Sequence, residues 1–147
     1  MESGYETTPD PTDGKLKFGV QVVSLDNVIK SYQNSWMGNL YYRKLDYLRD
    51  EQFIENIKKI YHDVHNRPYD IDLLDWIKAG LNIHIGNEHK TNSFWCSALA
   101  SYIYCKMKFL KDVPWTIISP KNFSYYEDNK TLKFINCEVA PEKKILL

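Results

Sequence analysis

The segment that follows Asp50 carries the clearest structural signal in this sequence, because it repeats apolar residues at the spacing of an α-helix. The apolar residues are Phe53, Ile57, Ile60, Tyr61 and Val64. Asp50 is suited to cap the first turn, and Asn66-Arg67-Pro68 is a sequence that ends a helix. A helix with a single apolar face must be covered by a second layer, so other parts of the chain must pack on it.

Short β-branched runs and further helical patterns alternate along the rest of the chain. We predict strands over 18–25, 37–45, 113–119 and 131–139, and helices over 26–33, 72–80 and 93–110. A Ser-Pro turn and a short helical piece separate the last two strands. This mixture predicts an α+β fold. The 147 residues, 44% of them apolar, are interpreted as one domain, 1–147.

Composition excludes several classes of function. Lys+Arg 19 balance Asp+Glu 19 without a long run of one sign, so the sequence gives no basis for a nucleic-acid partner. No apolar stretch approaches the roughly 18 residues of a transmembrane helix, and the N-terminus has no signal-peptide pattern. There is no P-loop, GxGxxG, HExxH or EF-hand motif, and no CxxC pair, so we predict no cofactor and a reducing compartment.

One cysteine stands where a polar turn leads into a helix, in the sequence Ser93-Phe94-Trp95-Cys96-Ser97-Ala98-Leu99. A thiol at a helix N-terminus faces unpaired N–H groups and the positive end of the helix dipole, which favour its nucleophilic thiolate. The alternative interpretation is a small buried thiol, since free cysteines are commonly buried. The helical period places Cys96 on one face with Leu99, Ala100, Ile103 and Met107.

Cys105 and Cys137 lie within a helix pattern and a strand pattern, so both are interpreted as structural. None of the four histidines lies in the first sixty residues. His62 and His65 are three apart on the helix after Asp50; they form either a solvated helix face or part of a metal site, and no third ligand motif completes the site. His84 and His89 precede Cys96 in the sequence and are candidates for its base.

Several motifs occur in an order that is more specific than any one of them. They are the Gly-Val strand Gly19–Leu25, Tyr42-Arg43, Arg67-Pro68-Tyr69-Asp70, Trp95-Cys96-Ser97 and Ile118-Ser119-Pro120-Lys121-Asn122-Phe123. In this order they resemble the circularly permuted NlpC/P60 papain-like family, which includes bacterial YiiX/YaeF-like proteins and poxvirus relatives. The similarity covers residues 1 to about 139.

The resemblance implies a papain-like α+β fold, in which a small antiparallel sheet packs against helices and a helix N-terminus presents the cysteine nucleophile. Cys96 matches that nucleophile. Glu2-Ser3-Gly4 matches the family's Glu, which orients the catalytic histidine, and the residues after it. The histidine itself then belongs upstream of Met1, so we expect the domain to be N-terminally incomplete. Ala98 stands where many bacterial members have Glu.

Two functions remain as hypotheses. The first is a cysteine hydrolase or acyltransferase, of amidase or thiol-peptidase type, in which Cys96 and Glu2 act on a small amide- or acyl-containing, lipid-like substrate through a thioacyl intermediate. The alternative is an inactive family member that serves as a binding or virion structural protein. The missing first segment would leave an exposed sheet edge, which is suited to self-association or to assembly in a virion. We expect a cytoplasmic or virion-associated location.

Overall fold

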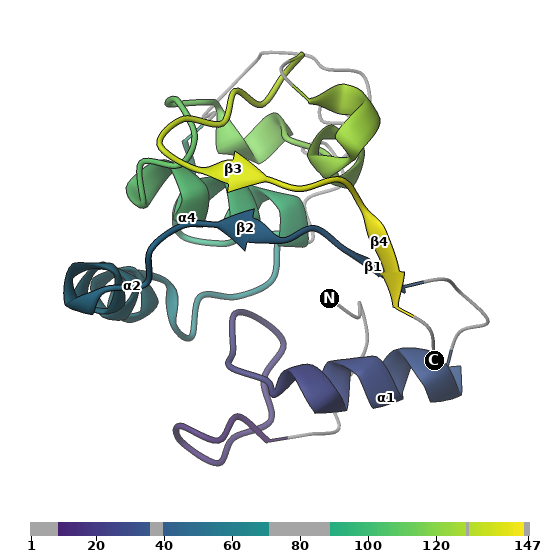
Figure 1. Cartoon of the computed structure of the whole chain (residues 1–147). Helices are drawn as coiled ribbons and strands as arrows, with labels where there is room; N and C mark the ends of the chain where they lie inside the picture. The colour runs from purple at the N-terminus through teal and green to yellow at the C-terminus, as the bar shows by residue number, and fades with distance from the viewer. Residues whose placement is uncertain (1–8, 36–39, 71–88, 129, 146–147) are drawn as a thin grey trace.

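The computed structural model describes residues 9–35, 40–70, 89–128 and 130–145 (Figure 1). Its helices are α1 (Leu25–Ser35), α2 (Glu51–Val64) and α4 (Cys96–Lys106), with three 3₁₀-helices, η1 (Trp115–Ile117), η2 (Pro120–Phe123) and η3 (Tyr125–Glu127). Its strands are β1 (Leu40–Tyr42), β2 (Leu45–Asp46), β3 (Glu138–Val139) and β4 (Lys143–Ile145). The strands form two antiparallel pairs, β1 with β4 and β2 with β3. The result is a small α+β fold, as the sequence predicts.

The helix predicted after Asp50 is confirmed at both ends. The Asp50 carboxylate accepts a hydrogen bond from the Phe53 N–H at 2.8 Å, which caps α2. Ile60 and Val64 are buried on its apolar face. The helix ends at His65, and Asn66 follows with φ 66°, a left-handed conformation that asparagine tolerates better than most residues.

Residues 40–46 and 138–145 run antiparallel along each other, and β2 and β3 cross in front of α4 (Figure 1). Arg43 lies between β1 and β2 and ties both to the rest of the molecule. Its guanidinium forms a two-pronged ion pair with Asp128, at 2.7 and 2.6 Å. It also donates to the carbonyl oxygens of Ala140, Phe123 and Val139, at 2.8, 3.0 and 3.2 Å. One side chain therefore fixes three segments that the short strands alone would hold weakly.

Aromatic rings dominate the core between α2 and α4. Phe94 and Trp115 contact Tyr102, with ring centroids 5.3 and 5.2 Å apart, and Ile60 and Val64 of α2 join the same cluster. A second cluster contains four buried residues: Leu110, Val113, Ile118 and Leu132. Among the described residues, no helix has the length and apolarity needed to cross a membrane.

The strand predicted over 113–119 is wrong, because the centre of this segment forms η1. Trp115, Thr116 and Ile117 are all buried. Buried and exposed residues therefore do not alternate here, and the pattern cannot distinguish a helix from a strand. The backbone of this segment turns on itself instead, and the Ile117 N–H donates to the Pro114 carbonyl at 3.1 Å. The predicted Ser-Pro turn and helical piece are confirmed by η2 and η3.

The other predicted strands are much shorter in the structure. The segment 131–139 has only β3 at its end and an isolated pairing of Phe134 with Leu110, since Asn136 adopts φ 56° and interrupts extension. The segment 18–25 makes one bridge, at Gly19, and then enters α1. The segment 37–45 contains β1 and the first residue of β2. The helix predicted over 72–80 lies outside the described residues.

Asp10 anchors the segment before α1 to the end of α2. Its carboxylate is fully buried and accepts from the Lys17 ammonium at 2.8 Å and from the Thr12 hydroxyl at 2.5 Å. The His65 ring lies 3.1 Å away, and the Val22 N–H donates at 3.3 Å. Burial raises the pKa of Asp10, but the bonds from Lys17, Thr12 and His65 outweigh it and hold this pKa far below its usual range.

We expect Arg43→Met to lower the free energy of unfolding by about 3 kcal/mol, because it leaves the Asp128 carboxylate without its partner. Urea denaturation monitored by circular dichroism measures this change. Arg49→Met is the matched control, since Arg49 is exposed, and it is expected to change the free energy little. Equal effects of the two substitutions would contradict the anchoring role of Arg43.

We expect the stability contributed by Asp10 to be lost in acid. A carboxylate whose pKa is lower in the folded state stabilises the fold fully above its unfolded pKa, and this contribution falls as the pH drops through that value, near 3.8. The urea midpoint should therefore decrease below about pH 5. Asp10→Asn should have a lower urea midpoint at pH 7, and this midpoint should decrease less in acid than that of the wild-type protein. Asp46→Asn, at an exposed position, should show the same pH dependence of the midpoint as the wild-type protein.

Candidate functional site

Cys96 is the first residue of α4, a position close to the helix start that the sequence predicts at residue 93. The preceding residue, Trp95, has extended backbone angles, φ −93° and ψ 171°, and makes no side-chain capping bond. The first helical bond of α4 runs from the Leu99 N–H to the Trp95 carbonyl, at 2.9 Å. The N–H groups of the first turn therefore have no carbonyl partner within the helix and carry its positive end beside the thiol.

Three segments that are distant in the sequence pair just before Cys96. Gly19 bridges Pro68 in antiparallel fashion, and Tyr69 bridges Phe94 in parallel fashion. The Val20 N–H donates to the Arg67 carbonyl at 2.8 Å, and the Asp70 N–H donates to the Phe94 carbonyl at 3.0 Å. Three of the motifs behind the resemblance thus meet at the N-terminal end of α4.

Glycine is required at position 19 by the close approach of two backbones. A Cβ atom there would collide with the Arg67 carbonyl oxygen and press on Pro68. Because both are main-chain atoms, neither can turn away as a flexible side chain would. Gly19 therefore allows residues 18–20 to lie against residues 67–69.

A fourth motif is attached through the second residue of α4. The Ser97 hydroxyl donates to the Ile118 carbonyl at 2.5 Å, in a buried position. The following turn is closed by Asn122, whose side-chain oxygen accepts from the Ser119 N–H at 2.8 Å and from its hydroxyl at 2.9 Å. The sequence Ile118-Ser119-Pro120-Lys121-Asn122-Phe123 is thereby held against the start of α4.

Tyr69 and Asp70 supply polar groups near this end of α4. Burial raises the pKa of the Tyr69 phenol, and the negative charges of Cys96 and Asp70 raise it further, so the phenol is neutral at physiological pH. The buried Asp70 carboxylate lies 2.9 Å from the Lys90 ammonium and accepts from the Ser93 hydroxyl at 3.1 Å. The order of motifs in the sequence pointed to these residues without assigning their side chains a role.

The predicted face of Cys96 is not the most deeply buried face of α4. The buried residues of α4 are Ser97, Ala98, Ser101 and Tyr102, whereas Cys96, Leu99, Ala100 and Ile103 are only partly buried. The small side chains let the helix approach η1, which packs against it. Cys96 consequently lies outside the closely packed contact between α4 and η1, and it is partly accessible to solvent.

The other two cysteines have the surroundings of structural residues. The Cys105 thiol donates to the Lys111 carbonyl at 3.4 Å, and the Cys137 thiol to the Phe109 carbonyl at 3.8 Å. Burial raises the pKa of both thiols, which disfavours their reactive thiolate form. All three cysteines are free thiols.

The histidines that the structure describes have partners of other kinds. The His65 Nε2 atom lies 2.9 Å from the Lys17 ammonium and 3.1 Å from the Asp10 carboxylate, while His62 is exposed beside Tyr61. His89 packs edge-on against Trp115, with centroids 4.4 Å apart, and lies 3.7 Å from an Asp112 oxygen.

His62 and His65 are not completed into a metal site by the described residues, which contain no group of three or more possible His, Cys, Asp or Glu ligands. A lysine ammonium against the His65 nitrogen also occupies the position that a cation would need. Two candidate residues, Glu2 and His84, lie outside the residues that the structure describes.

Comparison with known proteins adds no relative to this picture. The chain matches no protein-family model, no curated protein and no solved structure. The class that the described residues define is therefore an α+β protein with a partly exposed cysteine at an uncapped helix N-terminus. Function must be inferred from that geometry and from the order of motifs in the sequence.

Two buried serines on α4 provide a matched test of its packing. Ser97→Ala should lower the free energy of unfolding by about 1 to 2 kcal/mol, because the buried Ile118 carbonyl loses its hydroxyl donor. Ser101→Ala should be neutral or slightly stabilising, since the buried Ser101 hydroxyl has no hydrogen-bond partner in the described part of the chain. Denaturant unfolding of both variants checks this, and equal losses would contradict the assignment.

Proposed function

We propose that this protein is a cysteine-dependent hydrolase or acyltransferase whose nucleophile is Cys96. The observation that carries the proposal is the position of this thiol at the uncapped, positive end of α4, where it is partly accessible. The four motif segments around it support the same assignment, because they are the ones that resemble the permuted NlpC/P60 papain-like family. A papain-like arrangement of the domain is part of this proposal.

The reaction begins when the Cys96 thiolate attacks the carbonyl carbon of an amide or ester. A carbon–sulfur bond forms, and the negative charge that develops on the carbonyl oxygen is stabilised by N–H groups of the first turn of α4. The carbonyl re-forms as the amine or alcohol leaves with a proton, which yields a thioester on Cys96. Water or another acceptor then attacks the thioester, and the thiol is regenerated.

The proton transfers require a base near Cys96. In the proposal this base is a histidine that Glu2 orients. Alternatively, His84 or His89 takes the place of that histidine. His65 is an unsuitable candidate, because its Nε2 atom is already engaged with Asp10 and Lys17. The neutral Tyr69 phenol is suited to donate a hydrogen bond within the same site.

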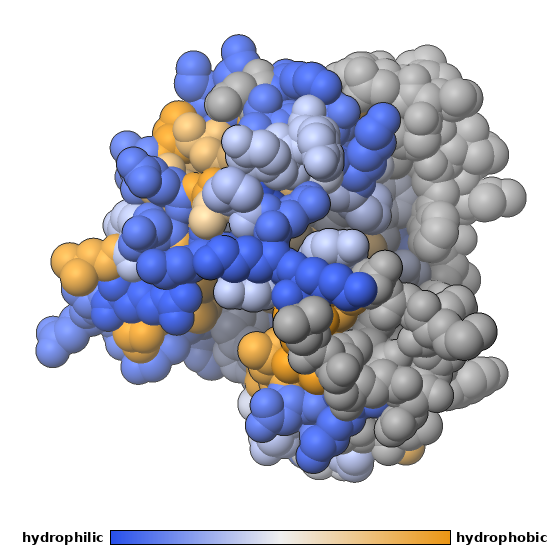
Figure 2. Space-filling view, turned by 45° about the vertical axis from the view of Figure 1, so that its right-hand side comes forward, coloured by the Kyte–Doolittle hydropathy of each residue, from blue (hydrophilic) through white to orange (hydrophobic). Residues whose placement is uncertain are grey.

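Exposed apolar side chains next to Tyr69 support a small, lipid-like acyl substrate. Phe18 packs against Tyr69 with ring centroids 5.3 Å apart, and about half of its surface is exposed. Leu16, Val22 and Leu25 are exposed in the same segment. Figure 2 shows apolar patches in the lower part of the molecule, where Figure 1 places this segment and α1. An acyl chain would bury part of that apolar area.

Chemical labelling tests the nucleophile directly. We expect iodoacetamide to alkylate Cys96 in the folded protein faster than Cys105 or Cys137, because burial raises the pKa of those two thiols and so lowers the fraction present as reactive thiolate. A p-nitrophenyl ester of a short fatty acid should then release a burst of nitrophenol and leave an acyl group on Cys96. Peptide mass spectrometry locates both modifications.

The controls separate Cys96 from the other thiols. Cys96→Ser should abolish the burst, whereas Cys105→Ser should retain it. Acylation of Cys105 or Cys137 without Cys96 in the folded protein would overturn the proposal. A Cys96 that is alkylated rapidly but never acylated would instead favour the second candidate function.

The second candidate is an inactive relative that binds a partner or forms part of a virion. The contacts of His65 with Asp10 and Lys17 favour it, because they leave this histidine unsuited to act as the base of Cys96. The strand edges favour it too, because in the described residues β1 and β2 each pair with one strand only and keep an outer edge. Under this candidate the Cys96→Ser variant keeps its oligomeric state, measured by light scattering, while the wild-type protein shows no acylation.

A further inference from the structure

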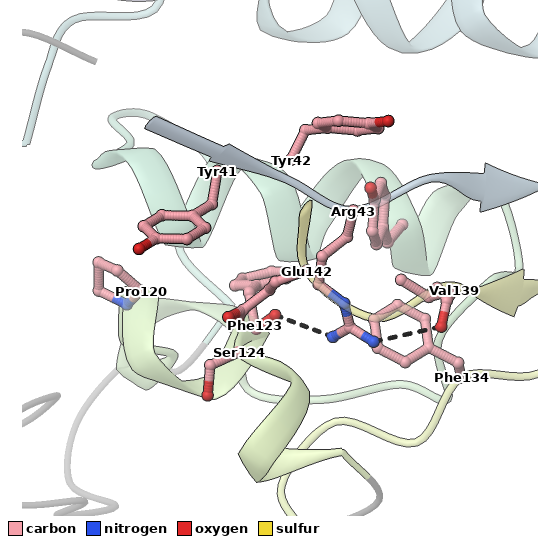
Figure 3. Close-up of a pocket in the computed structure, with 10 residues that line it drawn as sticks. Tyr41, Tyr42, Arg43, Pro120, Phe123, Ser124, Phe134, Val139 and Glu142 are labelled. Atoms are coloured by element: carbon pink, nitrogen blue, oxygen red, sulfur yellow. Dashed lines mark hydrogen bonds between the residues drawn. The ribbon is translucent and has the colours of Figure 1, made fainter. Parts of the chain in front are cut away.

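A cavity of about 320 Å³, drawn in Figure 3, lies beside the C-terminal part of α4, which contributes Tyr104 to its wall. Tyr104 follows Cys96 by eight residues, which corresponds to about 12 Å along a helix. The other walls of the cavity come from β1, η2, the segment around Phe134 and the turn before β4. Its size is within the range of pockets that hold small molecules, roughly 300 to 1,000 Å³.

Five of the ten described residues that line the cavity are aromatic: Tyr41, Tyr42, Tyr104, Phe123 and Phe134. Tyr104 contacts both Phe123 and Phe134 edge-on, with centroids 6.1 Å apart in each case, so these rings support one another. The Tyr41 ring extends over the cavity near Pro120 in Figure 3. The faces of such rings carry partial negative charge, which attracts cations.

The positive charge in the cavity wall is already neutralised within the protein. Arg43 pairs with Asp128 through two hydrogen bonds, and its remaining N–H groups donate to carbonyl oxygens of Ala140, Phe123 and Val139. A guanidinium has five N–H donors, and these contacts use all of them. Arg43 is therefore unsuited to bind an anionic ligand, although it lines the cavity.

Glu142 supplies a negative charge that has no such counterion among the residues that the structure describes. It lines the cavity, and one of its carboxylate oxygens accepts a hydrogen bond from the Tyr125 N–H at 3.0 Å. A carboxylate has about four acceptor positions, so most of its capacity remains for a ligand. Among the described lining residues, Arg43 and Glu142 carry the formal charges, and only the charge of Arg43 has an ion-pair partner.

We propose that this cavity binds a small organic cation, with an alkylammonium head between the aromatic rings and Glu142. The rings supply cation–π attraction and apolar contact for the alkyl groups, while the carboxylate supplies the opposite charge. Ser124, also in the wall, offers a hydroxyl for a polar group of the ligand. The site is independent of Cys96 and of the function proposed for it.

Choline and its uncharged carbon analogue 3,3-dimethyl-1-butanol test this site, because they share shape and differ in charge. We expect choline to shift the backbone amide resonances of Ser124 and Glu142 in ¹H–¹⁵N NMR titrations, with a dissociation constant about tenfold lower than that of the neutral analogue. Glu142→Gln should raise the choline dissociation constant about fivefold to tenfold and leave that of the analogue unchanged.

Two further variants keep the test specific. Tyr41→Leu removes a ring from a half-exposed position, so the fold should survive while choline binding weakens. Glu138→Gln removes an exposed carboxylate that does not line the cavity, and it should bind choline as the wild-type protein does. Equal affinity for choline and its analogue, or equal effects of Glu142→Gln and Glu138→Gln, would overturn the proposal, and so would the absence of shifts at Ser124 and Glu142.

Discussion

The close approach of Gly19 to the Arg67 carbonyl is the contact on which the Cys96 site depends. It allows residues 18–20 to pair with 67–69, and the other side of that segment then pairs with Phe94 through Tyr69. Phe94 and Trp95 are consequently extended, and α4 can begin only at the next residue, Cys96. The position of the thiol at the helix end therefore follows from a main-chain contact between two segments that both lie well before it in the sequence.

Partly or fully buried ion pairs take the orienting role that longer strands have in larger sheets. The strands span two or three residues each, which is too short to fix the segments by pairing alone. Arg43 with Asp128, and Asp10 with Lys17 and His65, connect segments that are far apart in the sequence. Such pairs add little net stability once desolvation is counted, but each has one geometry that satisfies all its donors. They determine how the segments are arranged.

The sequence predicted the elements whose signal is local. Helix α2 was predicted correctly because its cap at Asp50, its apolar stripe and its stop at Asn66 each depend on a few neighbouring residues. The start of α4 was predicted three residues too early because Trp95 offers no capping signal. The strand predicted over 113–119 was wrong because a fully buried run has no period, and the strand predicted over 131–139 was too long because pairing needs a distant partner. The contacts of Asp10 with His65 and the cavity beside Arg43 join distant segments, so no local pattern reveals them.

The two ends of α4 differ in a way that follows from its composition. Small residues on its buried face bring the helix against η1, while Cys96 lies off that face and is partly exposed. The reactivity proposed for Cys96 depends on the helix dipole and on the N–H groups of the first turn beside the thiol. At the other end, Tyr104 contributes a ring to a cavity whose only unneutralised lining charge, among the described residues, is Glu142. The proposed nucleophile and the proposed cation site thus lie where the helix dipole gives a field of matching sign, positive near the N-terminus and negative near the C-terminus.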